Sequence, residues 1–304
     1  MKSVDDLTTL DQSESTSAMS RTFDFVELMK PRLTILSVLT TLAGYYIGAR
    51  GQVDLGLLVH LLGGTFLVGG GCGTINMVIE REQDAQMKRT LKRPLPAGRL
   101  TVNDALIWGI VSTVIGLLWL GLTTPPLTTF LAALTFITYV FLYTPLKRRT
   151  TLNTIVGAIP GALPPLIGWS AATSGLDSGA LALGALLFFW QMPHFLALAW
   201  MYRKDYARAG FRMLPSIDPL GETTSRQMVL YVAALIPVSM IPTLVGISGK
   251  FYLFGALFLG VLFLVLCVRF AIARSGSTAR TVFHFSLIYL PALLICMIID
   301  EPTF

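Results

Sequence analysis

A polar segment between two long apolar runs carries residue types that could bind a metal ion and a diphosphate. Asn76, Glu80 and Asp84 follow one another at intervals of four residues, so on a helix their side chains lie along one face. Mg²⁺ usually takes one or two protein carboxylates and completes its octahedron with water and phosphate oxygens. This amide and these two carboxylates therefore predict a site for Mg²⁺ bound together with a diphosphate.

Basic residues follow this acidic stripe directly, and two prolines then end the helix. They are, in order, Lys88, Arg89, Lys92, Arg93, Pro94 and Pro96. Lys and Arg form charge-assisted hydrogen bonds with phosphate oxygens, so we expect Lys88, Arg89 and Arg93 to hold the diphosphate. The alternative interpretation is a basic loop that only marks the topology of a membrane protein, with its Glu/Lys pairs on a solvated face.

A second polar segment begins about 120 residues further on and again joins the end of an apolar run to charged residues. Its first members are Tyr202, Lys204, Asp205, Tyr206 and Arg208. A third, shorter segment contains Lys147, Arg148 and Arg149. This third segment is either part of an anion pocket or a cluster that sets topology. The spacing of the two longer segments suggests a duplicated half-unit with a site between the halves.

His194 lies in an apolar run, two to three helical turns before Asp205. An ionisable residue at membrane depth is a candidate functional residue. A buried, hydrogen-bonded, neutral histidine is the alternative interpretation. The preceding apolar run contains three prolines and three glycines between Gly157 and Gly168. These residues also allow two interpretations. They either break that helix to line a cavity or let it pack closely against a neighbour.

The elements that must position these residues are membrane helices. The chain has 304 residues, of which 54% are apolar and only 13% charged, with a mean hydropathy of +0.68. Soluble domains carry about 25% charged residues, so this composition predicts an all-α, polytopic membrane protein. Its net charge of +6 fits an anionic leaflet or an anionic substrate and no nucleic-acid partner.

Nine apolar runs are long enough to cross a bilayer. They cover residues 28–49, 54–79, 104–122, 126–145, 152–172, 178–201, 227–247, 251–270 and 281–299. In this map 21 of the 23 Lys and Arg residues fall on one side, and only Arg50 and Lys250 on the other. We therefore expect the N-terminus and the three polar segments to be cytoplasmic and the C-terminus to lie outside.

The first residues of the chain are polar and acidic, with neither an apolar signal core nor an Arg-rich transit pattern. We expect residues 1–22 to form a disordered tail and residues 23–304 a single transmembrane domain. This favours the bacterial plasma (inner) membrane over a mitochondrial location.

The pattern N-x-x-x-E-x-x-x-D-A-x-M-x-R-T-x-x-R-P-L-P-x-G, from Asn76 to Gly98, resembles the first signature of the UbiA superfamily of intramembrane prenyltransferases. Further elements resemble its protoheme IX farnesyltransferase (heme O synthase) branch: KPRLT at 30–34, LKRRTTLN at 146–153, GALPPLIGW at 161–169, PHF at 193–195 and DYARAG–ML-P at 205–215. The superfamily usually has Asp where this chain has Glu80, and a second acid where it has Met201.

The resemblance implies nine helices around a central cavity that opens to the cytoplasmic face, with Mg²⁺ as cofactor. It implies transfer of a farnesyl group from farnesyl diphosphate to a vinyl group of heme b, with addition of water, to give heme O for terminal oxidases. It also suggests heme A synthase or terminal oxidase assembly as protein partners. The alternatives are a UbiA-type enzyme with another aromatic acceptor, a heme transporter without chemistry, or a structural assembly subunit.

Carried over residue by residue, the resemblance assigns roles to the three polar segments and to the histidine. The implied metal ligands are Asn76, Glu80, Asp84 and Asp205. The implied diphosphate ligands are Arg89 and Arg93, and we expect the nearby cations Lys88, Lys147, Arg148 and Lys204 to bind the diphosphate with them. Tyr202 and Tyr206 belong to the implied catalytic loop, where aromatic faces stabilise an allylic cation. His194 is implied to bind heme.

Overall fold

Helices are the only regular secondary structure in residues 21–300, the part of the chain that the computed structural model describes. The long helices are α2 (Pro31–Ala49), α3 (Leu55–Ile79), α5 (Val102–Thr123), α6 (Pro126–Ile137), α8 (Asn153–Thr173), α9 (Ser178–Met201), α12 (Glu222–Leu244), α13 (Lys250–Ala273) and α14 (Gly276–Ile299). Helix α6 continues through a π-helical turn η1 (Thr138–Tyr143) into α7 (Thr144–Leu146). Short helices α4 (Arg81–Asp84), α10 (Arg203–Arg208) and α11 (Leu214–Ile217) lie in the two long connections.

Eight of these segments in the described chain are long and apolar enough to cross a membrane, so the predicted membrane protein is confirmed but the count of nine is not. Helix α2, which corresponds to the first predicted span, is not among the eight. Its sequence includes Arg32 and several Thr and Ser residues, which lower its hydropathy. Helix α2 nevertheless packs along α8 inside the bundle.

Two predicted spans begin earlier than expected because polar residues cap them. Helix α12 starts at Glu222 instead of residue 227, since Asp218 accepts a hydrogen bond from the backbone N–H of Thr224 (2.7 Å). Helix α14 starts at Gly276 instead of residue 281, since Ser275 accepts from the backbone N–H of Thr278 (3.2 Å). Caps of this kind satisfy the free N–H groups of a first turn, which an apolar run does not reveal.

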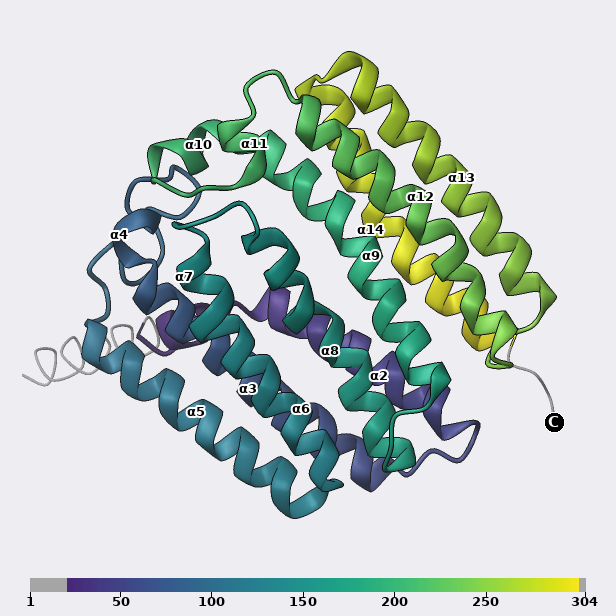
Figure 1. Ribbon diagram of the computed structural model, residues 1–304. Helices are drawn as coiled ribbons and strands as arrows, with labels where there is room; N and C mark the ends of the chain where they lie inside the picture. The colour runs from purple at the N-terminus through teal and green to yellow at the C-terminus, as the bar shows by residue number, and fades with distance from the viewer. Residues whose placement is uncertain (1–20, 301–304) are drawn as a thin grey trace, which may run out of the picture.

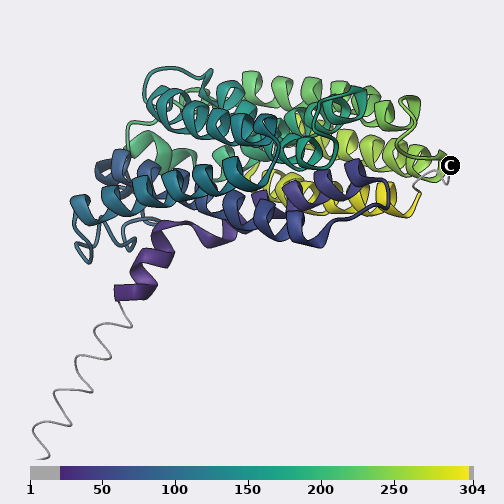
Figure 2. The ribbon, with the colours of Figure 1, turned by 90° about the horizontal axis from the view of Figure 1, so that it is seen from below.

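The predicted tail lies almost entirely outside the described residues. Its last two positions, 21 and 22, belong instead to a helical stretch over residues 21–28, which Figure 2 shows leaving the side of the bundle. Arg99 binds this stretch through Asp24 and Glu27, each at 2.7 Å. These ion pairs attach it to the connection between α4 and α5.

The described part of the bundle has two large buried cores and two smaller hydrophobic clusters. One lies among α9, α12, α13 and α14 and contains Trp190, Phe263 and Tyr289; the other lies among α2, α3, α5, α6 and α8 and contains Tyr45 and Leu120. Helices α8 and α9 pack against each other and join the two groups. The polar connections on both sides of this junction can therefore meet at one end of the bundle.

Close packing against α2 requires a glycine in α8. The helix is continuous through its three internal prolines. A Cβ atom at Gly168 would clash with the carbonyl oxygen of Thr41 on α2, and one at Gly44 with that of Pro165. Of the two interpretations of this run, the structure supports helix packing through small residues.

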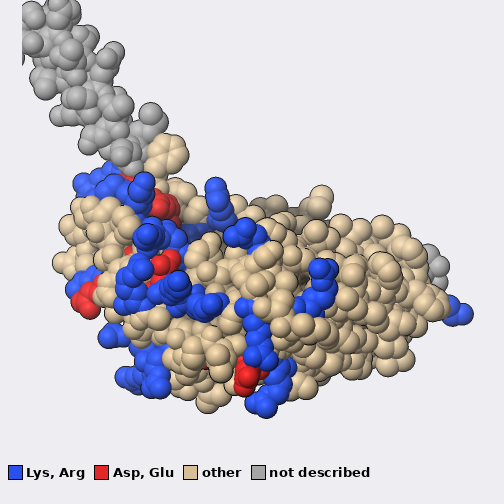
Figure 3. All heavy atoms as spheres, turned by 90° about the horizontal axis from the view of Figure 1, so that it is seen from above, with Lys and Arg blue, Asp and Glu red and all other residues tan. Residues whose placement is uncertain are grey.

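One end of the bundle, called here the loop face, carries α4, α7, α10 and α11 (Figure 1). Lys and Arg side chains gather over this face, with few acidic side chains among them (Figure 3). The backbone N–H of Arg212 donates to the carbonyl of Lys147 (2.7 Å), and Met87 packs against Phe211 and Met213. The three polar segments predicted from the sequence therefore contact one another.

Candidate active site

The acidic stripe forms as the spacing predicts. Asn76 lies in the last turn of α3, Glu80 follows that helix, and Asp84 ends α4. The helical bonding continues across the junction, because Glu80 N–H donates to the Asn76 carbonyl (3.0 Å) and Asp84 N–H to the Glu80 carbonyl (2.8 Å). These three residues are at most 5% exposed, so a solvated face, the alternative interpretation, is wrong for them.

Each member of the stripe has a cationic partner from a different part of the chain. Arg93 lies 2.6 Å from Asp84, and Lys147 lies 2.8 Å from Glu80. The amide oxygen of Asn76 accepts a hydrogen bond from Lys30. The buried stripe is thus enclosed by three cations that come from the start of α2, the first polar connection and the end of α7.

The π-helical turn before α8 positions one wall of this cluster. Pro145 has no N–H to donate, and just before it the N–H of Thr144 bonds to the carbonyl of Tyr139, five residues back. The Thr144 hydroxyl then accepts a hydrogen bond from the amide of Asn76 (2.9 Å). Such π-turns often occur at functional sites, and this one directs Thr144 and Lys147 at the acidic stripe.

Lys30 is a site residue that the predicted ligand set omits. Its backbone is left-handed (φ 50°, ψ 57°), although a residue before proline normally prefers extended conformations. Burial, followed by the charge of Arg93, lowers the pKa of Lys30 to about 7. The strained backbone fits a residue that the surrounding fold constrains for function. The KPRLT element at 30–34 is the signal in the sequence that marks this lysine.

Lys147 belongs to the same electrostatic cluster. Burial favours its neutral form, but the adjacent carboxylate of Glu80 outweighs this and raises the pKa of Lys147 above its usual value. The cluster contains three basic side chains, Lys30, Arg93 and Lys147, and two carboxylates. When Lys30 is protonated, the cluster carries one more positive than negative charge, which makes it suitable for an anion.

The carboxylate oxygens of the cluster are suited to a Mg²⁺ ion that is also bound by a phosphate group. They do not form a complete metal site by themselves. Oδ1 of Asp84 is buried with no hydrogen-bond partner. Oε1 of Glu80 faces Lys147 at ion-pair distance but without hydrogen-bond geometry. Within residues 21–300 no three His, Cys, Asp or Glu side chains gather as a complete metal site. Mg²⁺ needs only one or two protein carboxylates when phosphate supplies the other ligands, so these residues fit an ion that binds with a diphosphate.

The second polar connection meets the first through a cation–π contact. The guanidinium of Arg89 lies 4.7 Å from the ring centre of Tyr202 and 4.6 Å from that of Tyr206. Lys147 makes a similar contact with Tyr143, at 4.5 Å. The structure therefore brings Arg89 and both tyrosines together, next to a second pair of cation and aromatic ring.

Other predicted site residues lie on the periphery of the loop face. Lys88, Arg148 and Lys204 are exposed. Asp205 forms an ion pair with Arg208 (3.4 Å), and none of the contacts found in residues 21–300 joins it to Glu80 or Asp84. Asp218 and Glu222, which have the spacing of a metal motif, cap α12 and pair with Arg274 respectively.

His194 is buried in α9, and both faces of its ring are covered. Trp190 stacks on it with ring centres 5.2 Å apart, and Phe283 from α14 with ring centres 4.8 Å apart. Nδ1 of His194 lies 2.7 Å from the hydroxyl of Ser286. The histidine thus lies at the packed junction of α9 and α14.

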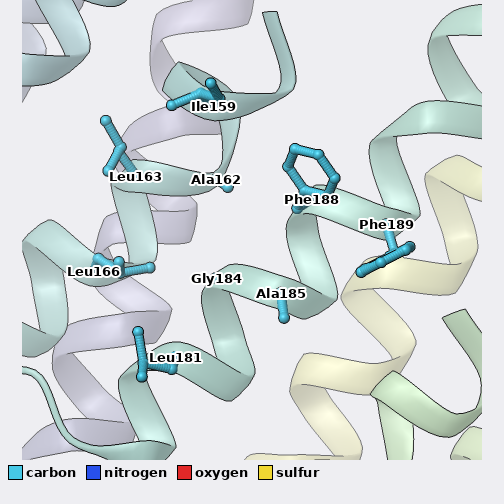
Figure 4. Close-up of a pocket in the computed structure, with 9 residues that line it drawn as sticks. All are labelled: Ile159, Ala162, Leu163, Leu166, Leu181, Gly184, Ala185, Phe188 and Phe189. Atoms are coloured by element: carbon cyan, nitrogen blue, oxygen red, sulfur yellow. The ribbon is translucent and has the colours of Figure 1, made fainter. Parts of the chain in front are cut away.

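An apolar groove between α8 and α9 is separate from this cluster. Figure 4 shows its lining side chains, which include Leu163 and Leu166 from α8 and Phe188 and Phe189 from α9. Ile159 and Leu181 at its edge are exposed. None of the candidate site residues lines this groove.

A buried cluster of carboxylates and cations at the end of a membrane-spanning bundle is suited to handling an anionic substrate with an apolar tail. The sequence model of the UbiA prenyltransferase family matches residues 37–289. The chain therefore belongs to the UbiA prenyltransferase family and is a prenyltransferase.

Two similar proteins with assigned names indicate which kind of prenyltransferase the chain resembles. The chain is 47% identical over 290 residues to the protein named "Protoheme IX farnesyltransferase" of Solibacter usitatus, covering 92% of this chain and 99% of the relative. It is 45% identical over 281 residues to the protein of the same name of Salinibacter ruber, covering 91% and 98%.

Solved structures share the fold. A digeranylgeranylglyceryl phosphate synthase superposes with a TM-score of 0.78 at 17% identity, covering 92% of this chain and 98% of that one. A UbiA homologue from Archaeoglobus fulgidus, bound to DMAPP and Mg²⁺, superposes with a TM-score of 0.62 at 14% identity, covering 90% and 99%. These similarities confirm the all-helical fold class predicted from the sequence.

Proposed function

We propose that this chain transfers the farnesyl group of farnesyl diphosphate to a vinyl group of heme b, with addition of water, to form heme O. The observation that carries this proposal is its 47% identity, over nearly the whole of both chains, to a relative named protoheme IX farnesyltransferase. The buried cluster on the loop face supplies the groups that this reaction needs.

The diphosphate binds over the acidic stripe, where Lys30, Arg93 and Lys147 already lie. In the structure these cations contact Asn76, Asp84 and Glu80. When the diphosphate binds, these side chains turn from the acidic stripe toward the phosphate oxygens and form charge-assisted hydrogen bonds with them. Lys88, Arg148 and Lys204 are exposed and guide the anion toward the site by long-range attraction.

Asn76, Glu80 and Asp84 would hold Mg²⁺, which supplies charge stabilisation for the departing diphosphate. Asp205 is the proposed ligand from the second connection. The allylic C–O bond breaks with its electron pair leaving on the diphosphate. The half-buried cations Lys30, Arg93 and Lys147 stabilise that developing negative charge.

Aromatic faces stabilise the farnesyl cation until it is attacked. Tyr202 and Tyr206 already hold the guanidinium of Arg89 over their rings, so both offer faces that attract a cation. A vinyl carbon of heme then bonds to the farnesyl carbon. Water adds to the resulting cation and loses a proton, which gives the hydroxyethylfarnesyl substituent.

His194 is the proposed heme-binding residue. It lies seven residues before Met201, the last residue of α9, and thus about 10 Å below the end of that helix. A porphyrin at this depth extends toward the loop face, where the reacting end of farnesyl diphosphate binds. The proposed heme and farnesyl diphosphate therefore bind at different depths of the bundle.

We also propose an orientation and a cellular setting. The excess of Lys and Arg on the loop face (Figure 3) supports a cytoplasmic location for that face in a bacterial plasma membrane, with the C-terminus outside. Farnesylated heme is strongly apolar and needs a receiver within the bilayer. Heme A synthase or an assembling terminal oxidase is the proposed partner on this chemical ground.

Product mass tests the proposed function. Membranes that contain the protein are given heme b, farnesyl diphosphate and Mg²⁺, and the pigments are analysed by mass spectrometry. We expect a heme that has gained farnesyl and the elements of water, and its loss on chelation of Mg²⁺ and in Asp84→Ala. Diphosphate release with a farnesylated aromatic acceptor other than heme would contradict the proposed substrate, and absence of any prenyl transfer would indicate a heme transporter or an assembly subunit.

A further inference from the structure

Ser286, on α14, contacts the proposed heme-binding histidine directly. Its hydroxyl oxygen lies 2.7 Å from Nδ1 of His194 and 2.6 Å from the carbonyl oxygen of Phe283. Ser286 and His194 are both buried, and no element of the proposed chemistry so far uses the serine. The direction of these two hydrogen bonds determines which nitrogen of the histidine carries the proton.

The proton positions follow from the acceptor at Phe283. A carbonyl oxygen can only accept, so with the hydroxyl proton of Ser286 on the Phe283 carbonyl the serine oxygen is an acceptor toward the ring. Nδ1 of His194 then donates to it. In this arrangement, which is assigned from the hydrogen-bond network, the ring is the Nδ1–H tautomer and Nε2 retains its lone pair.

Aromatic rings surround the imidazole, and Phe195 also lies edge-on to it with ring centres 5.3 Å apart. Trp190 and Phe283 cover its two faces, and the indole N–H of Trp190 donates to the backbone carbonyl of Ser286 (2.9 Å). These contacts fix α9 against α14 at the level of the histidine. Nε2 makes no hydrogen bond in the described chain and is not among its fully buried polar atoms without a partner. Nε2 is thus the ring nitrogen of His194 that is left for a ligand.

We propose that Ser286 is a positioning residue that holds His194 in this tautomer so that Nε2 binds the iron of the heme substrate. The proposal rests on the proposed function, because it takes heme b as the acceptor. A neutral imidazole nitrogen is the commonest protein ligand of metals. A hydrogen bond to the other ring nitrogen fixes the orientation of such a ligand and raises its basicity.

Heme titration of the purified full-length protein in detergent tests this role, with ferric heme b and no farnesyl diphosphate. The variants are His194→Ala, Ser286→Ala, Ser286→Thr and the double variant. The measured quantities are the heme dissociation constant, the Soret band and the iron–histidine signature in resonance Raman spectra. Ser239→Ala is a matched control, because Ser239 is also fully buried and its hydroxyl donates to the carbonyl three residues back (2.7 Å), but on α12.

We expect Ser286→Ala to weaken heme binding about 10–100-fold and to alter the iron–histidine signature. Ser286→Thr should restore much of both, and Ser239→Ala should match the wild type. Ser286→Ala should have no further effect in the His194→Ala background, because a positioning residue acts through the histidine.

Two results would overturn the proposal separately from the proposed function. A wild-type protein that makes heme O, with Ser286→Ala showing unchanged heme affinity and spectra, would exclude the positioning role alone. Equal losses from Ser286→Ala with and without His194 would show that the serine only supports the helix packing. A wild-type protein that binds no heme would overturn the heme acceptor, and this role with it.

Discussion

Lys147 Nζ lies 2.8 Å from Oε1 of Glu80, with both side chains mostly buried, and this contact joins the π-helical turn before α8 to the acidic stripe after α3. Buried ion pairs are costly to form, since the loss of hydration can exceed the attraction between the charges. A fold selected only for stability would have little reason to place two such pairs side by side. The second pair, Arg93 with Asp84, therefore supports a functional interpretation of the cluster.

Neutralising either carboxylate of the stripe should abolish most activity while the protein remains folded. Asp84→Asn and Glu80→Gln keep the side-chain shape but remove the charge that holds Mg²⁺ and its diphosphate. We expect kcat to fall roughly 100-fold or more, since charge-stabilising groups in active sites contribute on this scale. Heme O formation is measured per mole of purified protein, with thermal unfolding in detergent as the check on folding.

Glu82→Gln is the matched control for both changes. Glu82 lies in α4 between the two site acids, but its side chain is 71% exposed and only approaches Arg81, at 3.9 Å. Its removal should leave activity near the wild-type value. Equal losses in all three variants would show that the acidic helix matters only through its overall charge.

Lys30 should contribute to diphosphate binding through its charge and not only through its contact with Asn76. Lys30→Gln can still donate a hydrogen bond to the Asn76 amide oxygen but carries no charge. We expect it to raise KM for farnesyl diphosphate by about 10–100-fold, the scale of a lost hydrogen bond to a charged group. Arg32→Gln, which removes an exposed charge two residues away, should leave KM unchanged. A KM for Lys30→Gln equal to that of Arg32→Gln would reduce Lys30 to a structural partner of Asn76.

The contribution of Arg89 to activity should depend on the aromatic faces of Tyr202 and Tyr206 and not on their hydroxyl groups. The Tyr202→Phe and Tyr206→Phe variants keep the rings that cover the guanidinium and should retain most activity. Tyr202→Leu should lose about tenfold in kcat, since a cation–π contact contributes roughly 0.5–2 kcal/mol. Arg89→Lys keeps the charge but not the planar stacking group, so we expect an intermediate loss.

Lys88→Ala serves as the control for Arg89, because Lys88 is the neighbouring exposed cation. It should affect the rate only at low ionic strength, where long-range attraction is strongest. If Tyr202→Phe were as inactive as Tyr202→Leu, the hydroxyl rather than the ring face would be the functional group.

The spacing of Asn76, Glu80 and Asp84 was sufficient to predict the acidic stripe, because a four-residue interval fixes a shared helix face. It could not predict which cations complete the cluster. Lys30 reaches Asn76 from 46 residues earlier in the chain, and Lys147 comes from a segment that the sequence left open between an anion pocket and a topology signal. Such partners depend on how α2, α3 and α7 pack, and one sequence without its fold does not specify that.

Eight of the nine predicted spans are long and apolar enough to cross a membrane in the described chain, and they were predictable for a similar physical reason, whereas two of the helix starts were not. Long apolar runs identify membrane helices directly, so most boundaries agree within a few residues. Where polar caps extend a helix, as at Glu222 and Gly276, hydropathy alone places the start too late. Asp218 and Glu222 have the four-residue spacing of two metal-binding acids, but Asp218 caps α12 and Glu222 pairs with Arg274. Spacing alone does not distinguish these roles from metal binding.

Close contact between α2 and α8 should make Gly168 sensitive to a single added methyl group. A Cβ atom there would clash with the carbonyl oxygen of Thr41, whereas one at Gly121 on α5 would lie 3.8 Å from the nearest side chain. We expect Gly168→Ala to destabilise the fold by about 1–3 kcal/mol, the usual cost of overpacking. Gly121→Ala should be neutral or stabilising by up to about 1 kcal/mol, because alanine is the better helix former. Thermal unfolding of the two variants in the same detergent compares them. Equal melting temperatures would mean that α2 and α8 can separate without cost, and the pairing that places Lys30 beside Asn76 would then need another source of rigidity.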